Sequence, residues 1–289
     1  MSAMLGRAAH DRGALAARGR RLAWGACTYL MAIVNVTPDS FSGDGRMQTE
    51  LAIEHALAQW QQGADILDIG GESTRPGHEP VDDRTEIGRV EPVIRAVRER
   101  VPNAIVSVDT YKPAVARAAH AAGADIVNSI WGASDELLAV AAELGMPIVA
   151  MHNHRGTEYD RDVVDDVLAF LDDCGARAIA HGIARERIIL DPGIGFGKTP
   201  NHNIRILRQL SRIVALGFPT LLGTSRKSTI GKLTQREPHE RIYGTAATTA
   251  IGIASGVDVV RVHDVAQNRD VISVSDAIVR DWRPHGWTG

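Results

Sequence analysis

From Leu30 onward, short aliphatic stretches alternate with longer amphipathic ones, and polar residues separate the two kinds. Continuous apolar runs between turn residues are typical of buried strands, whereas apolar residues spaced by three and four predict helices. The pattern predicts strands at 30–35, 64–69, 104–109, 124–128, 147–151, 187–191, 219–223 and 258–262. It predicts helices near 48–62, 83–100, 112–122, 134–145, 161–183, 201–216, 238–255 and 267–281. This alternation favours an α/β fold, a TIM (β/α)8 barrel, over an open doubly wound sheet. No dinucleotide-type glycine motif follows the first strand, which supports the same choice.

The segment before these strands predicts a β-hairpin. Residues 15–25 contain two short strand-like runs around Gly19, and we expect the hairpin to close the bottom of the barrel. Residues 1–12 are expected to be a flexible tail, and 13–289 a single domain. The basic N-terminus is weakly similar to a transit peptide, but the hairpin is the simpler interpretation, and nothing there indicates a signal peptide.

Composition and charge exclude some functional classes. The 289 residues are 44% hydrophobic and 23% charged, an ordinary globular balance. The net charge of −3 argues against a nucleic-acid or membrane partner, and no apolar run reaches the roughly 18 residues of a membrane span. Cys27 and Cys174 lie far apart without metal-ligand spacing, so we expect reduced thiols in a cytoplasmic protein.

Polar residues gather where the predicted strands end. In a barrel these carboxyl ends share one face, where active sites are found. In chain order the strand ends carry Asn35, Asp68, Asp109, Asn128, His152, Asp191, Ser225 and His263. A single such residue could be a helix cap, but polar groups at all the strand ends predict a functional site.

One group of candidate residues suits an anion. Strands one, two and eight become neighbours when the barrel closes, and their ends carry Asn35, Arg75, Arg261 and His263. Cationic and amide donors suit a phosphate or pyrophosphate, and Asn35 and Asp68 could supply oxygens to a magnesium ion. The alternative for the two arginines is a surface ion pair.

A second group suits a planar heterocycle. Strands three, four, six and seven end near Asp109, Asn128, Asp191 and Lys227. Buried acids and amides need partners with a fixed donor pattern, and the amino-pyrimidinone edge of a pterin or purine provides one. A structural Asp191–Lys227 bridge is also possible, and it does not exclude the binding of a heterocycle.

Two further kinds of chemistry are weakly indicated. His152 and His154 invite a metal interpretation, but a His-x-His pair without a third ligand is poor evidence for zinc. No Ser-His-Asp or Cys-His set with a plausible order is present in the sequence.

Most of the strand ends lie within several long motifs. They are Asn35-Val-Thr-Pro-Asp-Ser-Phe-Ser, Asp68-Ile-Gly-Gly-Glu-Ser-Thr-Arg-Pro-Gly, Ser107-Val-Asp-Thr, Leu190-Asp-Pro-Gly-Ile-Gly-Phe-Gly-Lys-Thr, Ser225-Arg-Lys-Ser and Val260-Arg-Val-His-Asp. Together these motifs closely resemble those of the dihydropteroate synthases, and the resemblance extends from about Leu30 to the end of the chain. The resemblance implies the same barrel, a cytosolic homodimer and a transferase of folate biosynthesis. Its reaction would join para-aminobenzoate to 6-hydroxymethyl-7,8-dihydropterin pyrophosphate, giving 7,8-dihydropteroate and pyrophosphate.

The resemblance also implies residue roles. The second group of residues would hold the pterin, Asn35 would bind magnesium with Asp68 near it, and Arg75, Arg261 and His263 would take the pyrophosphate. Thr74 and Ser225 would border para-aminobenzoate, and the loop 37–45 would close over it. Because the amine is already nucleophilic, no strong general base is required.

The sequence departs from the family pattern at a few positions. Ser129 stands where Asp is usual, and Asn153 where Met or another apolar residue is usual. Thr229 stands where Phe is common, and the first loop reads Ser42-Gly-Asp-Gly. Changes near the aminobenzoate region leave open a sulfonamide-insensitive synthase. The motifs are also compatible with a methyltetrahydrofolate methyltransferase domain or with a catalytically silent pterin-binding paralogue.

Overall fold

The structure, a computed structural model, describes residues 12–36, 45–73 and 80–288. Its centre is a parallel sheet with the strand order β8-β7-β6-β5-β4-β3-β10-β9. The strands are β3 (Tyr29–Asn35), β4 (Ile66–Gly70), β5 (Ile105–Asp109), β6 (Ile126–Ser129), β7 (Ile148–Met151), β8 (Ile188–Asp191), β9 (Leu221–Leu222) and β10 (Val259–Val262). A bridge between Leu190 and Thr220 joins β8 to the start of the β9 segment and closes the barrel. The (β/α)8 barrel predicted from the sequence is confirmed.

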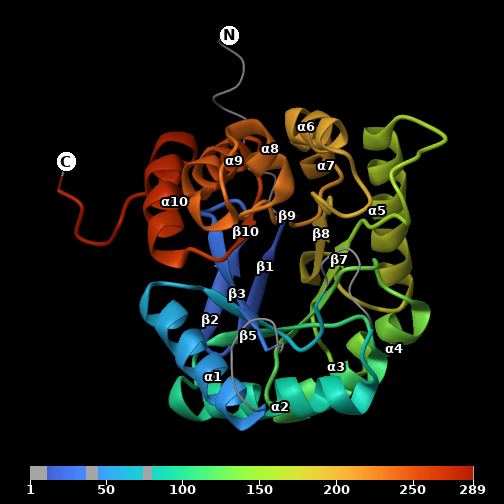
Figure 1. Cartoon of the computed structure of the whole chain (residues 1–289), viewed down its shortest axis with the longest axis vertical. Helices are drawn as coiled ribbons and strands as arrows, with labels where there is room; N and C mark the ends of the chain where they lie inside the picture. The colour runs from blue at the N-terminus through green and yellow to red at the C-terminus, as the bar shows by residue number, and fades with distance from the viewer. Residues whose placement is uncertain (1–11, 37–44, 74–79, 289) are drawn as a thin grey trace.

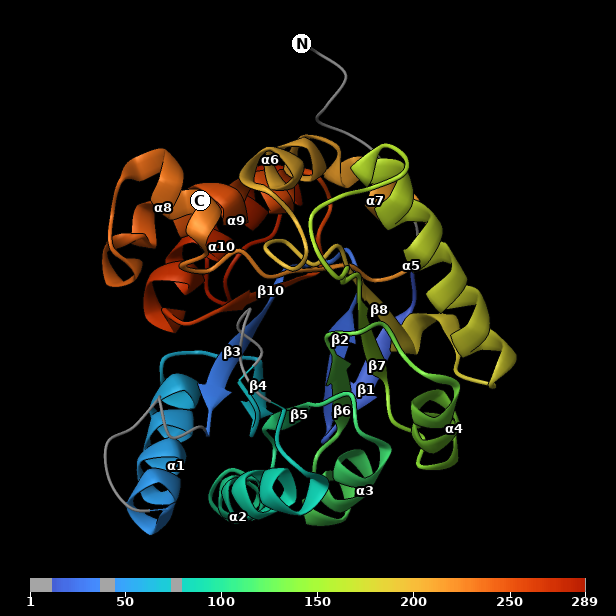
Figure 2. The same cartoon turned by 45° about the vertical axis from the view of Figure 1, so that its right-hand side comes forward.

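The helices lie around the outside of the strands (Figures 1 and 2). They are α1 (Gly45–Gln61), α2 (Asp83–Arg100), α3 (Pro113–Ala122), α4 (Asp135–Glu143), α5 (Val163–Ala180), α6 (Pro200–Arg208), α7 (Leu210–Val214), α8 (Ser228–Thr234), α9 (Ile242–Ala254) and α10 (Val265–Val279). Two 3₁₀ turns, η1 (Arg185–Arg187) and η2 (Pro238–Glu240), complete the elements. Within the described residues, no helix is long and apolar enough to cross a membrane.

The helices differ from the prediction in three places. The helix expected at 201–216 is divided at Gln209, whose φ of −119° is not helical. The helix α8 was not predicted, because its seven residues are too short to show a period. The helix expected from 238 begins as the turn η2 and becomes α-helical only at Ile242.

The predicted hairpin is present and closes the amino-terminal end of the barrel. It consists of β1 (Ala14–Ala17) and β2 (Arg20–Ala23), paired antiparallel. Leu15, Leu22 and Trp24 pack into a buried cluster with the first inward-facing residues of the strands. Those residues are Met31, Ile66, Ile105, Ile126, Val149, Ile189, Leu221 and Val259. The barrel therefore has an apolar floor, and polar groups can gather only at its other end.

Candidate active site

Inward-facing residues at the carboxyl ends of the strands form a polar layer above the apolar floor. Because side chains alternate along a strand, Asp68 faces inward two positions after Ile66. The strand register places Asp68 beside Ser107, and Asp109 beside Asn128. The alternation and the register together bring acids and amides from separate motifs into one region.

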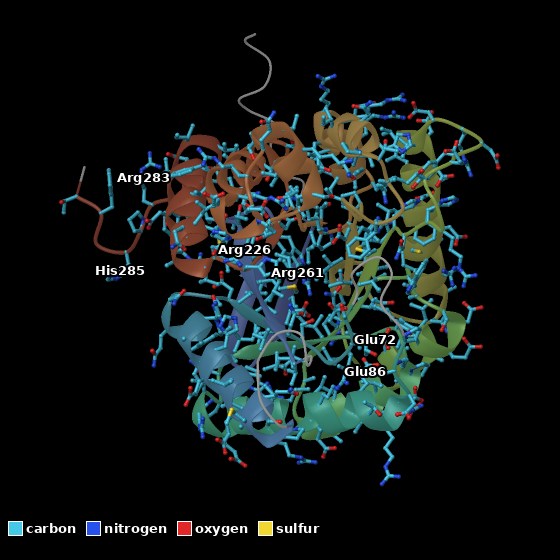
Figure 3. All side chains as sticks on the ribbon, in the orientation of Figure 1. Glu72, Glu86, Arg226, Arg261, Arg283 and His285 are labelled. Atoms are coloured by element: carbon cyan, nitrogen blue, oxygen red, sulfur yellow. The ribbon has the colours of Figure 1, made fainter. Side chains whose placement is uncertain are left out.

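Arg261 lies at the centre of this polar layer (Figure 3). Its Nε donates to Asp68 Oδ2 at 2.6 Å, and its Nη2 donates to Asp109 Oδ2 at 2.7 Å. The Nδ2 of Asn128 also donates to Asp68 Oδ2, at 2.9 Å. Arg261, from the predicted anion group, thus contacts Asp109, from the predicted heterocycle group, so the two groups adjoin in the folded protein.

Three buried oxygens of the layer lack a partner among the described residues. They are Asp68 Oδ1, Asp109 Oδ1 and Ser107 Oγ. A buried polar atom without a hydrogen bond costs about 1–3 kcal/mol. Their arrangement around Arg261 provides acceptors for a ligand that carries N–H groups.

Burial dominates the protonation of the site. It raises the pKa of Asp109 to about 7, although the charge of Arg261 acts in the opposite direction. Burial lowers the pKa of Arg261, but the negative charges of Asp68 and Asp109 raise it by more, so the pKa is raised overall. Asp109 therefore exchanges its proton near neutral pH and can either accept or donate a hydrogen bond.

Asp191 is the last residue of β8, and Lys227 lies on the loop after β9. Asp191 Oδ1 accepts from the N–H of Gly193 at 2.8 Å. Lys227 donates to the carbonyl of Ile194, and its Nζ lies 4.6 Å from the centroid of the Phe196 ring. Burial lowers the pKa of Lys227 to about 8, and Asp191 partly offsets this effect. Asp191 and Lys227 attract each other through their charges, but their hydrogen bonds go to the backbone of the loop after β8.

His263 is held as a neutral ring. Its backbone N–H donates to Ser225 Oγ at 3.1 Å, and its Nδ1 lies 3.0 Å from the same oxygen. Burial lowers its pKa to about 3, and the charge of Arg226 adds to the effect. Arg226 is itself paired with Asp264, with Nε donating to Oδ2 at 3.0 Å. His263 would thus meet an anion as a hydrogen-bonding group unless the anion raised its pKa.

Asn35, the last residue of β3, pairs with Gly70 in the strand register. Its side chain is half-buried at the mouth of the barrel. Asp68, the other predicted magnesium ligand, is already bonded to Arg261 and Asn128 through Oδ2. The described residues contain no cluster of three histidine, cysteine or acidic side chains that could hold a metal alone. A magnesium ion here would need most of its ligands from water and phosphate.

A second ionic cluster, which was not predicted from the sequence, lies beside the cluster that Arg261 forms with Asp68 and Asp109. Lys112 Nζ donates to Glu72 Oε2 at 2.6 Å, to Glu86 Oε2 at 2.7 Å and to the carbonyl of Val81 at 2.5 Å. The hydroxyl of Tyr111 donates to Glu72 Oε1 at 3.0 Å. Figure 3 places Glu72 and Glu86 near each other. Through Lys112 the cluster links Glu72 to Val81 and Glu86, which follow it in the sequence after the segment 73–80.

His152 is not available as a metal ligand. Its Nε2 lies 3.0 Å from Asp166 Oδ1 and its Nδ1 lies 2.8 Å from Lys198 Nζ. Burial lowers its pKa to about 4. Both ring nitrogens are used by protein groups, which agrees with the view that the His152–His154 pair is poor evidence for a metal site.

The departures from the family pattern have local explanations only in part. Ser129 is buried and its Oγ has no partner among the described residues. Thr229 accepts a hydrogen bond from Asn203 Nδ2 at 2.9 Å, which links α8 to α6. Thr74, Arg75 and the loop 37–44 lie outside the described residues, so their predicted roles remain predictions.

Comparison with known proteins identifies the family. The model of the pterin binding enzymes matches residues 31–263. The chain is 48% identical over 259 residues to the dihydropteroate synthase of Clostridium beijerinckii, covering 88% of this chain and 95% of that one. It is 46% identical over 271 residues to the synthase of Synechocystis, covering 90% and 92%.

Comparison with solved structures leads to the same family. The dihydropteroate synthase of Clostridium difficile, determined in the presence of pteroic acid, has a TM-score of 0.86 and 46% identity, covering 89% of this chain and 98% of that one. The synthase of Xanthomonas albilineans with 4-aminobenzoic acid has a TM-score of 0.87 and 41% identity, covering 93% and 98%. This chain therefore belongs to the pterin-binding enzyme family and, within it, to the dihydropteroate synthases.

Proposed function

We propose that this chain catalyses the dihydropteroate synthase reaction. Para-aminobenzoate attacks the methylene carbon of 6-hydroxymethyl-7,8-dihydropterin pyrophosphate. The new C–N bond forms, the C–O bond to pyrophosphate breaks, and the amine loses a proton. The observation that carries the proposal is Arg261 bridging Asp68 and Asp109, with their second oxygens left as acceptors in a buried layer.

The pterin would be held by the acids, the amide and the lysine of this layer. Asp191 and Asp109 provide acceptors for ring N–H groups, and Asn128 and Lys227 provide donors for ring nitrogen or carbonyl oxygen. Because the acids lie in a buried layer, their hydrogen bonds to the ring gain strength over those in water. A dihydropterin is electron-rich, so holding it in place favours the departure of pyrophosphate.

Pyrophosphate would lie beside the pterin at the mouth of the barrel. The hydrogen bonds of Arg261 to two carboxylates use only part of its N–H donors. The remaining donors can reach a phosphate oxygen while the carboxylates hold the guanidinium still. Arg75 would add a second cation, and His263 would donate or accept a hydrogen bond as a neutral ring.

Magnesium is proposed as the cofactor, with Asn35 as its direct protein ligand and Asp68 near it. When bound, the ion would neutralise charge that develops on the leaving pyrophosphate. The bonds of Asp68 to Arg261 and Asn128 make it the weaker candidate for direct ligation. Asn35, the last residue of β3, pairs with Gly70 at the end of β4, so it lies beside the strand that leads to Arg75, the second cation proposed for pyrophosphate.

Para-aminobenzoate would bind at Thr74 and Ser225, under the loop 37–45. Ser225 is buried and bonded to His263, so it would position this substrate together with the pyrophosphate group. The changed first loop motivates the proposal that sulfonamides, which imitate para-aminobenzoate, inhibit this enzyme weakly.

We also propose a cytoplasmic homodimer. Cys27 and Cys174 are free thiols, which suits a reducing compartment. Four large apolar side chains are exposed on the neighbouring helices α9 and α10, namely Tyr243, Ile251, Val274 and Ile278. Exposed apolar groups gathered on one face mark interaction surfaces. Analytical ultracentrifugation at several protein concentrations measures the state directly, and a monomer throughout would reject the dimer.

The test of the function is pyrophosphate release from the pterin substrate with magnesium, with and without para-aminobenzoate, and then with a sulfonamide. We expect release that depends on the amine, with dihydropteroate as the product. Lys227→Ala and Arg261→Ala should each abolish most of the turnover. Near-wild-type rates in both variants, or pterin binding without any turnover in the wild type, would reject the proposed reaction.

A further inference from the structure

Lys198 is a buried lysine to which neither the family motifs nor the proposed reaction assigns a role. Its residue is 7% exposed, and its Nζ has four acceptors within reach. They are His152 Nδ1 at 2.8 Å, the carbonyls of Gly193 and Phe196 at 2.9 Å each, and the carbonyl of His152 at 3.3 Å. An ammonium group has three N–H donors, so the three shortest contacts satisfy it.

The environment of Lys198 is costly for a charge. A buried ammonium needs hydrogen bonds to offset the loss of water, and burial lowers the pKa of Lys198 to about 7. Its hydrogen bonds among the described residues go to carbonyls and a ring nitrogen, and the charges of Asp191 and Asp166 offset the effect of burial only in part. A methionine or leucine would fill this space without that cost, so packing alone does not explain a lysine.

Two acceptors of Lys198, the carbonyls of Gly193 and Phe196, belong to the loop that follows β8, and the other two belong to His152, directly after β7. This loop crosses the end of β7 so closely that a Cβ on Gly193 would lie 1.8 Å from the carbonyl oxygen of His152. Gly193 has a φ of +66° and Gly197 a φ of +61°. Lys198 binds the carbonyls on either side of the turn between them, at Gly193 and Phe196.

The same loop contacts Lys227 through its other groups. The carbonyl of Ile194 accepts from Lys227, and the Phe196 ring lies against its ammonium. The N–H of Gly193 donates to Asp191. The backbone that Lys198 fixes is thus the backbone that sets where Lys227 and Asp191 point.

We infer that Lys198 is a positioning residue, which holds the loop 192–197 in the one arrangement that aims Lys227 and Asp191 at the pterin. The pterin part of this inference rests on the proposed function. The loop part rests on the contacts above and stands independently of it. Lys198 itself touches no substrate.

The first arm of the test does not depend on activity. Hydrogen exchange of the amides of 193–197 is compared between wild type and Lys198→Met, a change that keeps the length of the side chain and removes its donors. We expect faster exchange in this segment. The matched control is Lys232→Met, because Lys232 is an exposed lysine on α8 and should leave the exchange unchanged.

The second arm is a double-mutant cycle on the affinity for pteroic acid. We expect Lys198→Met to weaken binding about tenfold or more, corresponding to about 1.4 kcal/mol. In a Lys227→Met background the same change should have a clearly smaller effect, because only the part of its influence that passes through Asp191 remains. If Lys198→Met does not fold, Lys198→Gln, which retains two N–H donors, replaces it and should show a smaller loss in the same direction.

Unchanged amide exchange together with wild-type affinity would overturn the inference. So would an equal loss of affinity in both backgrounds, because that result indicates general damage. A wild-type protein that binds no pteroic acid would instead count against the proposed function. The hydrogen-exchange comparison would then still test whether Lys198 fixes the loop 192–197.

Discussion

Replacement of Arg261 by methionine should destabilise the protein in a strongly pH-dependent way. Arg261 is the shared partner of two buried carboxylates, Asp68 and Asp109. Breaking a buried ion pair from one side costs about 3–5 kcal/mol, because a charge is left uncompensated. We expect Arg261→Met to lower the free energy of unfolding by about 3 kcal/mol at about pH 6 and by about 5 kcal/mol at about pH 8.5.

The direction of the pH effect follows from Asp109. Its pKa in the folded wild type is raised to about 7, against about 3.9 in an unfolded chain. Such a group stabilises the fold fully only below the unfolded pKa, and the contribution is lost as the pH rises through the folded pKa. Without Arg261 the folded pKa rises further. Above about pH 7 the variant therefore continues to lose up to about 1.4 kcal/mol per pH unit from this group, after the wild-type contribution has levelled off.

Urea unfolding at several pH values measures both effects. Asp109→Asn in the Arg261→Met background should remove the extra slope and restore part of the stability. Arg117→Met is the matched control, because Arg117 and Glu143 form an exposed pair, and solvent screening makes the loss of such a pair much less costly. A small and pH-independent loss in Arg261→Met, equal to that of the control, would refute the reasoning.

Two further substitutions test the surroundings of the site. Lys112→Met removes the cation shared by Glu72 and Glu86 and should cost about 3–5 kcal/mol by thermal or urea unfolding. The exposed-pair variant Arg95→Met should cost at most about 1 kcal/mol, and equal losses would contradict a structural role for the cluster. Gly193→Ala would place a Cβ 1.8 Å from a backbone oxygen and should cost well over the ~1–2 kcal/mol of a left-handed alanine. Gly145→Ala, with a φ of +62° and nothing within 4 Å of its Cβ, should show only that conformational cost, and a similar loss in both would contradict the close approach.

The hydrophobic pattern was sufficient for the barrel because each strand is buried on both sides. Such strands read as short continuous apolar runs, and turn residues separate them from the helices. The helix ends were less predictable. Gln209 interrupts a helix without a glycine or proline to announce it, and α8 is shorter than the window in which a period can be read.

The sequence predicted which residues lie at the carboxyl end of the barrel, but not how they pair. It placed Arg261 with the anion group because strands one, two and eight are neighbours. An arginine is long, however, and the interior of an eight-stranded barrel is only wide enough for side chains to fill it. Arg261 therefore reaches Asp109 on β5, which is two strands beyond its neighbour β3 in the sheet. The contacts of the buried lysines Lys112 and Lys198 could not be predicted, because their partners come from several loops and from α2 without a shared periodic pattern.

The charges of the polar layer explain why these residues suit a neutral, N–H-rich ring. Asp68, Asp109 and Asp191 provide three acids in this layer, whereas Arg261 and Lys227 provide two cations. The imbalance is one negative charge, and the raised pKa of Asp109 shows that burial favours a proton in its place. A ring that donates hydrogen bonds to the acids relieves the same imbalance without adding charge. Pyrophosphate, by contrast, would add negative charge beside carboxylates, so the proposed function requires it nearer the mouth, where Asn35 lies and where the proposed metal ion and Arg75 would compensate its charge. Depth in the barrel would thus separate the neutral ring from the charged leaving group.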